Sequence, residues 1–151
     1  MSRVMKVVVL GAMFVVLSAG TALAATLVGT AGDDNISGSG VSDQIFTLED
    51  NDTVDGMGGN DEIYGNENND NLIGAEGSDT VYGNTGNDAV DLASFDIPGD
   101  RDKGYGGKGN DTIGARDGNF DIVNCGEGGS DVAFFDAGID QVAANCESRN
   151  P

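Results

Sequence analysis

A strict nine-residue repeat runs without a gap from residue 29 to residue 91, and no other feature of the sequence constrains the fold as strongly. Its seven units read GTAGDDNIS, GSGVSDQIF, TLEDNDTVD, GMGGNDEIY, GNENNDNLI, GAEGSDTVY and GNTGNDAVD. The sixth place is always aspartate, namely Asp34, Asp43, Asp52, Asp61, Asp70, Asp79 and Asp88. The eighth place is always aliphatic, namely Ile36, Ile45, Val54, Ile63, Leu72, Val81 and Val90. Such a fixed period is the signature of a repeat architecture in which each unit packs on its neighbours.

Composition alone favours a different conclusion. The chain of 151 residues has a net charge of −19 and only 6% aromatic residues, a balance typical of disordered proteins. A disordered acidic chain, however, does not keep its aspartates and aliphatic residues in register. The repeat therefore predicts an ordered domain, and the length allows one such domain.

The pattern G-G-x-G-x-D-x-U-x, in which U is aliphatic, resembles the RTX (hemolysin-type) calcium-binding nonapeptide repeat. The units GMGGNDEIY and GNTGNDAVD match it closely, and the pattern returns as GGKGNDTIG at residues 106–114. The resemblance implies an all-β fold, a right-handed parallel β-roll, which is a β-solenoid of nonapeptide repeats. Each unit would contain a glycine-rich loop followed by a short strand whose aliphatic eighth residue points inward.

Two units would form one coil of the roll, so that like places stack eighteen residues apart. Asp34, Asp52, Asp70 and Asp88 would then lie along one edge, and Asp43, Asp61 and Asp79 along the other. Carboxylates stacked about 4.8 Å apart repel by roughly 3–4 kcal/mol per pair. Several such pairs exceed the total stability of a small domain, about 5–15 kcal/mol, so the edges require a cation.

Calcium suits these edges because it accepts about six to eight oxygen ligands in loose geometry. Magnesium stays a weaker alternative, since it demands stricter octahedral geometry and keeps its waters. A zinc site of the usual histidine type is excluded because the chain contains no histidine.

In the family, sixth-place aspartates and loop carbonyls of adjacent turns bind calcium, so the resemblance implies several Ca²⁺ ions and a set of ligands. These are Asp34, Asp43, Asp52, Gly56, Gly58, Asn60, Asp61, Asp70, Asp79, Asp88, Asp111 and Asp131. Asp61 with Asp79 and Asp70 with Asp88 form the best-matched pairs, and the carbonyls of Gly56, Gly58 and Asn60 would belong to the first pair. The units around Asp43 and Asp52 depart from the pattern, which weakens their sites, because Val41 and Asp50 replace the fourth-place glycine.

The first 24 residues have the composition of a secretory signal peptide. Arg3 and Lys6 precede an apolar run at residues 7–17, and Ala22-Leu23-Ala24 offers a cleavage site of the A-x-A type. The alternative is an uncleaved membrane anchor, for which the apolar run is short. Cleavage would leave a secreted, extracellular β-roll domain of residues 25–151 without a membrane span. Loss of the two basic residues would change the net charge from −19 to −21, which disfavours binding to nucleic acid or anionic lipid.

Residues 92–105 interrupt the repeat and are expected to form a loop insertion, after which a looser repeat runs over residues 106–134. Asp121 and Val123 take the aspartate and aliphatic places there, and Phe134 and Phe135 are candidates for closing the core. Residues 125–151 would form the C-terminal cap. Cys125 and Cys146 are the only cysteines; in an exported chain such a pair indicates a disulfide, and two free thiols are the alternative.

No catalytic constellation is found, so we do not expect an enzyme: without histidine, the serine and cysteine hydrolase arrangements and H-E-x-x-H are excluded. The first functional hypothesis is an exported protein whose β-roll folds on calcium. The second is a calcium-dependent adhesion or interaction module for cell wall, glycan or a partner protein, with Phe46, Tyr64, Tyr82 and Ile73 on its outer face. A small lyase or hydrolase has only fold-level analogy in its favour.

Overall fold

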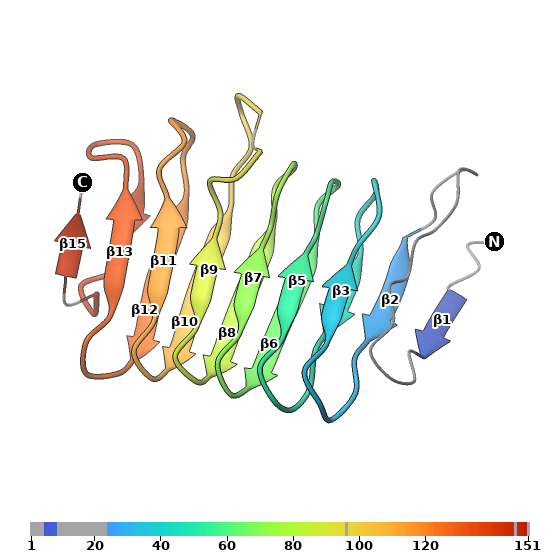
Figure 1. Ribbon diagram of the computed structural model, residues 1–151. Helices are drawn as coiled ribbons and strands as arrows, with labels where there is room; N and C mark the ends of the chain where they lie inside the picture. Colours follow the sequence, from blue (N-terminus) through green and yellow to red (C-terminus); the bar gives the residue numbers. More distant parts are fainter. Residues whose placement is uncertain (1–4, 9–23, 96, 147, 151) are drawn as a thin grey trace.

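The computed structural model describes residues 5–8, 24–95, 97–146 and 148–150, and every regular element in these ranges is a β-strand. From β2 onward the strands alternate along the chain between two sheets, whose strands run in opposite directions in Figure 1. Sheet A contains β1 (Met5–Val8), β2 (Ala25–Val28), β4 (Gln44–Phe46), β6 (Glu62–Glu67), β8 (Thr80–Thr85), β10 (Lys103–Lys108), β12 (Ile122–Glu127) and β14 (Gln141–Val142). Sheet B contains β3 (Asn35–Ser37), β5 (Thr53–Asp55), β7 (Asn71–Ile73), β9 (Ala89–Asp91), β11 (Thr112–Ala115), β13 (Val132–Phe135) and β15 (Ser148–Asn150).

Strand pairing follows the repeat. All pairs are parallel, and the partners in β4 and β6 lie two units apart, as in Ile45 opposite Ile63. Sheet B has the same register, with Val54 opposite Leu72 and Leu72 opposite Val90. The predicted all-β parallel solenoid, with two nonapeptides in each coil, is therefore confirmed.

The core lies between the two sheets, and the three-residue strands contribute one side chain each to it. The short strands of the repeat bury their middle residue and expose the two beside it more, as in the buried Leu72 of β7. The buried side chains form one cluster: Leu27, Ile36, Ile45, Val54, Ile63, Leu72, Val81, Val90, Leu92, Ile113, Ala115, Val123, Cys125, Ala133 and Cys146, with Ala25 at its N-terminal end. This cluster places every eighth-place aliphatic residue inside, as the pattern predicts.

The turns between strands depend on left-handed backbone at fixed places of the unit. The second place has positive φ in successive units, with Met57 at 74°, Ala75 at 69° and Asn84 at 75°. Gly77 and Gly86, in the fourth place, have φ of 124° and 152°. Glycine is required at Gly86, because a Cβ there would lie 1.8 Å from the Asn68 carbonyl oxygen of the preceding coil.

The insertion is shorter than residues 92–105, because β10 already begins at Lys103. The loop rises above the other turns in Figure 1, and it exposes 76% of Phe95. It lengthens the coil from eighteen to 23 residues, so that Thr80 pairs with Lys103.

Leu92 fills the space in the core that the coil with the insertion would otherwise leave empty. The aliphatic place after the insertion is occupied by Gly104, which contributes no side chain. Leu92 is fully buried, and a Cβ added to Gly104 would lie 2.9 Å from Leu92 Cδ1 and 3.0 Å from Ile113 Cγ2. A leucine in the first place of one unit therefore fills the space that an aliphatic eighth residue fills elsewhere.

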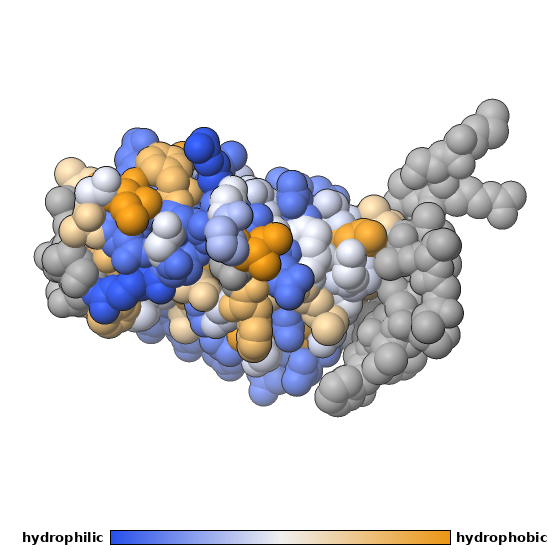
Figure 2. Space-filling view, turned by 90° about the horizontal axis from the view of Figure 1, so that it is seen from above, coloured by the Kyte–Doolittle hydropathy of each residue, from blue (hydrophilic) through white to orange (hydrophobic). Residues whose placement is uncertain are grey.

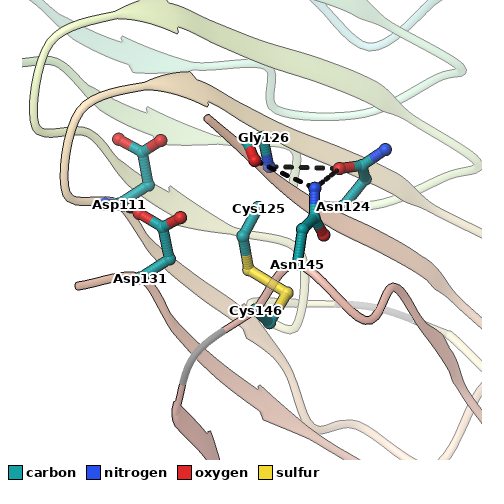
Figure 3. Close-up of a disulfide and its surroundings, with 7 residues drawn as sticks. All are labelled: Asp111, Asn124, Cys125, Gly126, Asp131, Asn145 and Cys146. Carbon is teal, nitrogen blue, oxygen red and sulfur yellow. Dashed lines mark hydrogen bonds between the residues drawn. A yellow bond between two sulfur atoms is a disulfide. The ribbon is translucent and has the colours of Figure 1, made fainter. Parts of the chain in front are cut away.

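A disulfide joins Cys125 of β12 to Cys146 near the C-terminus, as predicted, and both residues are buried in the core cluster. In Figure 3 it lies between the stacked Asp111 and Asp131 and the contact of Asn145 with Asn124. Asn145 Nδ2 donates to Asn124 Oδ1 at 2.6 Å, which attaches the same segment to β12 a second time. Phe135 packs against the core as expected. Phe134, the other residue expected to close it, is 39% exposed and lies under Arg116 instead.

At the other end, Met5–Val8 forms β1 and pairs with β2, with Met5 opposite Ala25. Most of the signal peptide expected over residues 1–24 lies outside the described residues. Across the ranges that the structure does describe, no helix has the length and apolarity needed to cross a membrane.

Candidate calcium-binding edges

The sixth-place aspartates form two continuous hydrogen-bonded ladders, one along each edge of the solenoid. Ladder A precedes the strands of sheet A and consists of Asp43, Asp61, Asp79, Asp102, Asp121 and Asp140. Ladder B precedes the strands of sheet B and consists of Asp34, Asp52, Asp70, Asp88, Asp111 and Asp131. Within each ladder, Oδ1 of one aspartate accepts the main-chain N–H of the aspartate one coil earlier, at 2.7–3.0 Å.

The ladders confirm the stacking expected from the sequence and add members that the sequence reasoning missed. Asp61 stacks with Asp79, and Asp70 with Asp88, as predicted. Asp102 lies within the range expected as the inserted loop, because Gly104 obscures the D-x-U-x pattern there. Asp140-Gln141-Val142 fits the pattern, so this member could have been found from the sequence.

The fifth place forms a second set of hydrogen bonds that runs in the opposite direction. Asn60 Oδ1 accepts the N–H of Ser78 at 3.1 Å, and Asn69 Oδ1 accepts that of Asn87 at 2.7 Å. Ser42 Oγ likewise accepts the N–H of Asn60. Side chains of adjacent coils thus satisfy two consecutive loop N–H groups in each unit, which explains the small polar residues of the fifth place.

In six ladder aspartates the second carboxylate oxygen lacks such a partner. Oδ2 is buried without a hydrogen-bond partner among the described residues in Asp61, Asp70, Asp79, Asp88, Asp111 and Asp121. A buried, unpaired carboxylate oxygen is unfavourable, and its repetition from coil to coil points to a missing positive group.

A main-chain carbonyl oxygen accompanies this unpaired oxygen. A Cβ built on Gly56 would lie 2.6 Å from Asp61 Oδ2 and 2.5 Å from the carbonyl oxygen of Gly74, one coil further on. Around Gly83, Asp88 Oδ2 and the Gly106 carbonyl take the same positions. First-place glycine is needed because any side chain would displace these two oxygens.

The three residues predicted to supply loop carbonyls to the first site, Gly56, Gly58 and Asn60, lie in different surroundings, and their role as ligands stays a prediction. The Gly56 carbonyl points toward Gly38 and Asp43, whereas the Gly74 carbonyl lies beside Asp61 Oδ2. Gly58 donates its N–H to the Ser39 carbonyl and bridges to Glu76. The side chain of Asn60 accepts from Ser78 in the fifth-place row.

Burial raises the pKa of several ladder carboxyl groups, among them Asp61, Asp70 and Asp79. Desolvation raises the pKa of Asp61 and Asp70 to about 7 and that of Asp79 to about 8, against a partial lowering by the ladder N–H bond of each. The neighbouring ladder aspartates raise these pKa values further through repulsion. The ionised form is thus unfavourable in the folded chain unless a cation is present.

The N-terminal end of each ladder is different. Asp34 Oδ2 accepts from the N–H and hydroxyl of Thr30, and Asp43 Oδ2 accepts from the N–H and hydroxyl of Ser39. Both oxygens of Asp43 are thereby used, since the Ala25 N–H donates to its Oδ1. Of the two sites at which the sequence departs from the pattern, the one at Asp43 therefore has no unpaired oxygen to offer.

The donors present fit a hard cation bound by oxygen. Among the described residues, no three carboxylate, histidine or cysteine side chains gather as a ready-made metal cage. Each ion would therefore require main-chain carbonyls in addition to carboxylates. Such a mixed oxygen set is what calcium accepts.

The family model of the RTX calcium-binding nonapeptide repeat, which describes four copies of the unit, matches residues 20–54, 38–72 and 64–96. These spans overlap and cover residues 20–96, just over half of the chain. The chain belongs to the RTX calcium-binding nonapeptide repeat family. The searches of curated proteins and of solved structures gave no match to this chain.

Four aromatic rings stack on the outer face of sheet A. Phe46, Tyr64, Tyr82 and Tyr105 follow one another at centroid distances of 4.8–4.9 Å with nearly parallel planes. Each inner ring covers the faces of its neighbours, so the stack presents ring edges to solvent. Ile73, predicted to share this face, is instead in β7 of sheet B between Asp55 and Asp91, so that prediction is wrong.

Figure 2 shows the loop side of the solenoid as largely polar, with hydrophobic residues in separate patches. Neither this surface nor the aromatic stack provides a specific observation in favour of the interaction-module hypothesis.

Proposed function

We propose that this chain is an exported calcium-binding protein whose β-roll folds on, and is stabilised by, calcium ions bound between stacked repeat loops. One observation carries the proposal: a buried, unpartnered Oδ2 recurs from coil to coil beside a main-chain carbonyl oxygen. Calcium would supply the positive charge that these oxygens lack. We assign no catalytic role.

The ligands proposed are the ladder aspartates with an unpaired Oδ2. They are Asp61, Asp79 and Asp121 in ladder A and Asp70, Asp88 and Asp111 in ladder B, together with first-place carbonyls such as that of Gly74. The ladder bond to Oδ1 fixes each carboxylate, so that Oδ2 is held in place before an ion arrives. Asp52 and Asp131 occupy equivalent rungs. We do not propose Asp34 or Asp43, since Thr30 and Ser39 already satisfy their Oδ2 atoms.

Export is supported by the N-terminal leader pattern and by the buried disulfide. Disulfides persist in oxidising compartments and are rare in the cytosol. An extracellular location also provides calcium at concentrations that weak, exposed-loop sites require, about 10⁻⁴–10⁻³ M.

Circular dichroism and small-angle scattering during a calcium titration test the proposal. We expect an expanded chain in chelator at pH 8 and a compact β-structure with calcium, while an equal concentration of magnesium has a much smaller effect. A spectrum and a radius of gyration that do not change on chelation would overturn the proposal.

Asp70→Asn and Asp33→Asn form a matched pair for this titration. Each removes one negative charge and keeps an amide oxygen as hydrogen-bond acceptor. Asp70 Oδ2 is buried and unpaired, whereas Asp33 is exposed and its Oδ1 accepts the Asn51 N–H. We expect Asp70→Asn to raise the calcium concentration at half-folding by about tenfold, equivalent to about 1.4 kcal/mol, and Asp33→Asn to leave it nearly unchanged. Equal shifts for the two variants would show that only net charge matters.

A further inference from the structure

The repeat extends one unit further toward the N-terminus than its aspartates do. The family match begins at residue 20, and a unit over residues 20–28 places Ala25 in the sixth place and Leu27 in the eighth. Leu27 is buried and pairs with Ile45, as an eighth-place residue should. Ala25 therefore occupies a rung of ladder A with a methyl group where other units have a carboxylate.

Ala25 nevertheless makes the main-chain hydrogen bond that is typical of the ladder. Its main-chain nitrogen donates to Asp43 Oδ1 at 2.7 Å, the same bond that Asp43 makes to Asp61. Asp43 is only 5% exposed, and its other oxygen accepts from Ser39. The nitrogen of residue 25 is thus fixed against a buried carboxylate.

We propose that removal of the leader between Ala24 and Ala25 converts this rung into an ion pair between the new α-ammonium and Asp43. The inference depends on the export signal contained in the proposed function, but not on calcium. A leader peptidase would hydrolyse the Ala24–Ala25 bond with one water molecule. The C–N bond breaks, hydroxyl from water adds to the Ala24 carbonyl to leave a carboxylate on the released leader, and Ala25 nitrogen becomes an ammonium.

The ammonium would supply the positive charge that the buried Asp43 carboxylate lacks, since the first coils contain no basic side chain. No lysine or arginine occurs between residue 25 and residue 100, whereas the mature chain's basic residues Arg101, Lys103, Lys108, Arg116 and Arg149 all follow. A buried carboxylate without a cation is unfavourable, and the new terminus is the positive charge placed closest in sequence to the start of ladder A.

Leader removal also provides water for the remaining ammonium hydrogens. β1 pairs with β2 in the full chain and is part of the leader, so its departure uncovers the outer edge of β2. One ammonium hydrogen would keep the bond to Asp43 Oδ1, and the others would face solvent. A terminus one residue further upstream would place the charge about 3.3 Å along the chain and restore a plain amide at residue 25.

Two chains that differ by one alanine test this proposal. One begins at Ala25 and the other at Ala24; both carry an α-ammonium, and their sequences are identical from Ala25 onward. Thermal unfolding at saturating calcium is measured for each chain, and for each with Asp43→Asn or Asp34→Asn. Asp34 is the matched control, because it begins ladder B and has its Oδ2 bonded to Thr30.

We expect the chain that begins at Ala25 to unfold about 4 °C higher, corresponding to a folding equilibrium constant about tenfold larger. The difference should persist in Asp34→Asn and vanish in Asp43→Asn. Equal melting temperatures of the two chains, or an unchanged difference in Asp43→Asn, would overturn the proposal.

Amine labelling provides a readout that does not require Asp43→Asn to fold. An acylating reagent followed by mass spectrometry should modify the α-amine of the Ala25 chain at least about tenfold more slowly in the folded protein than in urea, because a paired ammonium reacts poorly. The Ala24 chain should show little protection. Equal rates for both folded chains, or a secreted protein whose intact mass shows another first residue, would refute the ion pair. A chain that stayed folded in chelator would contradict the calcium proposal only. The comparison of the Ala25 and Ala24 chains would still test the ion pair.

Discussion

We expect this chain to fold without calcium when the pH is lowered, because protonation removes the negative charge of the buried ladder carboxylates. In the folded state without calcium, burial raises the pKa of Asp61 and Asp70 to about 7 and of Asp79 to about 8, from an ordinary value of 3.8. A carboxyl group with a raised folded-state pKa stabilises the fold fully below its unfolded-state pKa. That contribution is lost as the pH rises through the folded-state value. The calcium-free roll should therefore be most stable below about pH 4 and lose stability from there up to about pH 8.

The magnitude is large enough to decide whether the chain folds. A displacement of about three pKa units corresponds to about 4 kcal/mol, since each unit is 1.36 kcal/mol. Two such groups account for about 8 kcal/mol, comparable to the whole stability of a small domain, about 5–15 kcal/mol. Asp61 and Asp79 are consecutive rungs of ladder A and both are buried, so they titrate within the same element.

Circular dichroism and small-angle scattering in chelator, from pH 8 down to about pH 3, measure this effect. We expect compact β-structure to return with a midpoint between about pH 6 and 8, where the ladder carboxyls take up protons. The double variant Asp61→Asn/Asp79→Asn should be more folded at pH 8 without calcium than the parent, and less responsive to calcium. A chain that stays expanded at pH 5 would refute the reasoning. A midpoint near pH 4 would also refute it, because exposed carboxylates titrate there.

Three further predictions concern the core, the cap and the aromatic stack. Leu92→Ala should cost about 2–5 kcal/mol of unfolding free energy and Gly104→Val about 1–3 kcal/mol. The double variant should be more stable than the sum of the two effects predicts, and additive losses in urea titrations would contradict the packing described. Replacing both cysteines by serine should lower the unfolding free energy by about 3 kcal/mol with calcium present, and an unchanged urea midpoint would show that the bridge does not stabilise the cap. The hydrogen bond to Glu62, with burial, raises the pKa of Tyr64 to about 12, so Glu62→Gln should lower that pKa in an ultraviolet titration, and an unaltered titration would exclude the bond.

Most of the architecture could be predicted from the sequence, because the period itself specifies it. An aliphatic residue at every eighth place fixes which side chain of each strand points inward, as Ile63 and Leu72 do. A sixth-place aspartate in each unit fixes which residues stack, as Asp70 on Asp88. Where the period holds, local pattern and global register agree, and nothing else is needed to place the strands.

The predicted bounds of the inserted loop were wrong because the core position of one repeat unit is filled by a side chain from another part of the chain. Gly104 concealed a strand because its missing side chain is supplied by Leu92, twelve residues earlier in the sequence. A pattern that is read unit by unit does not detect such an exchange. The inserted loop was consequently extended over Asp102, which belongs to ladder A. The pattern also does not show which coil supplies the carbonyl nearest each aspartate, and the oxygen beside Asp61 Oδ2 comes from Gly74 in the next coil.

Comparison of the fifth and sixth places shows what the aspartates are for. Both places accept a main-chain N–H from an adjacent coil, and the fifth place does so with neutral groups such as Ser42, Asn60 and Asn69. Asparagine would serve equally well for Oδ1 in the sixth place, yet all twelve ladder members are aspartate, as the two ladders show. The ladder bond therefore does not explain the carboxylate. The second oxygen does, because it is the atom that is buried and unpartnered in residues such as Asp79 and Asp88, and a charged oxygen is what a calcium ion binds. The same carboxylate thus joins the coils through one oxygen and, in the function proposed, binds a cation through the other.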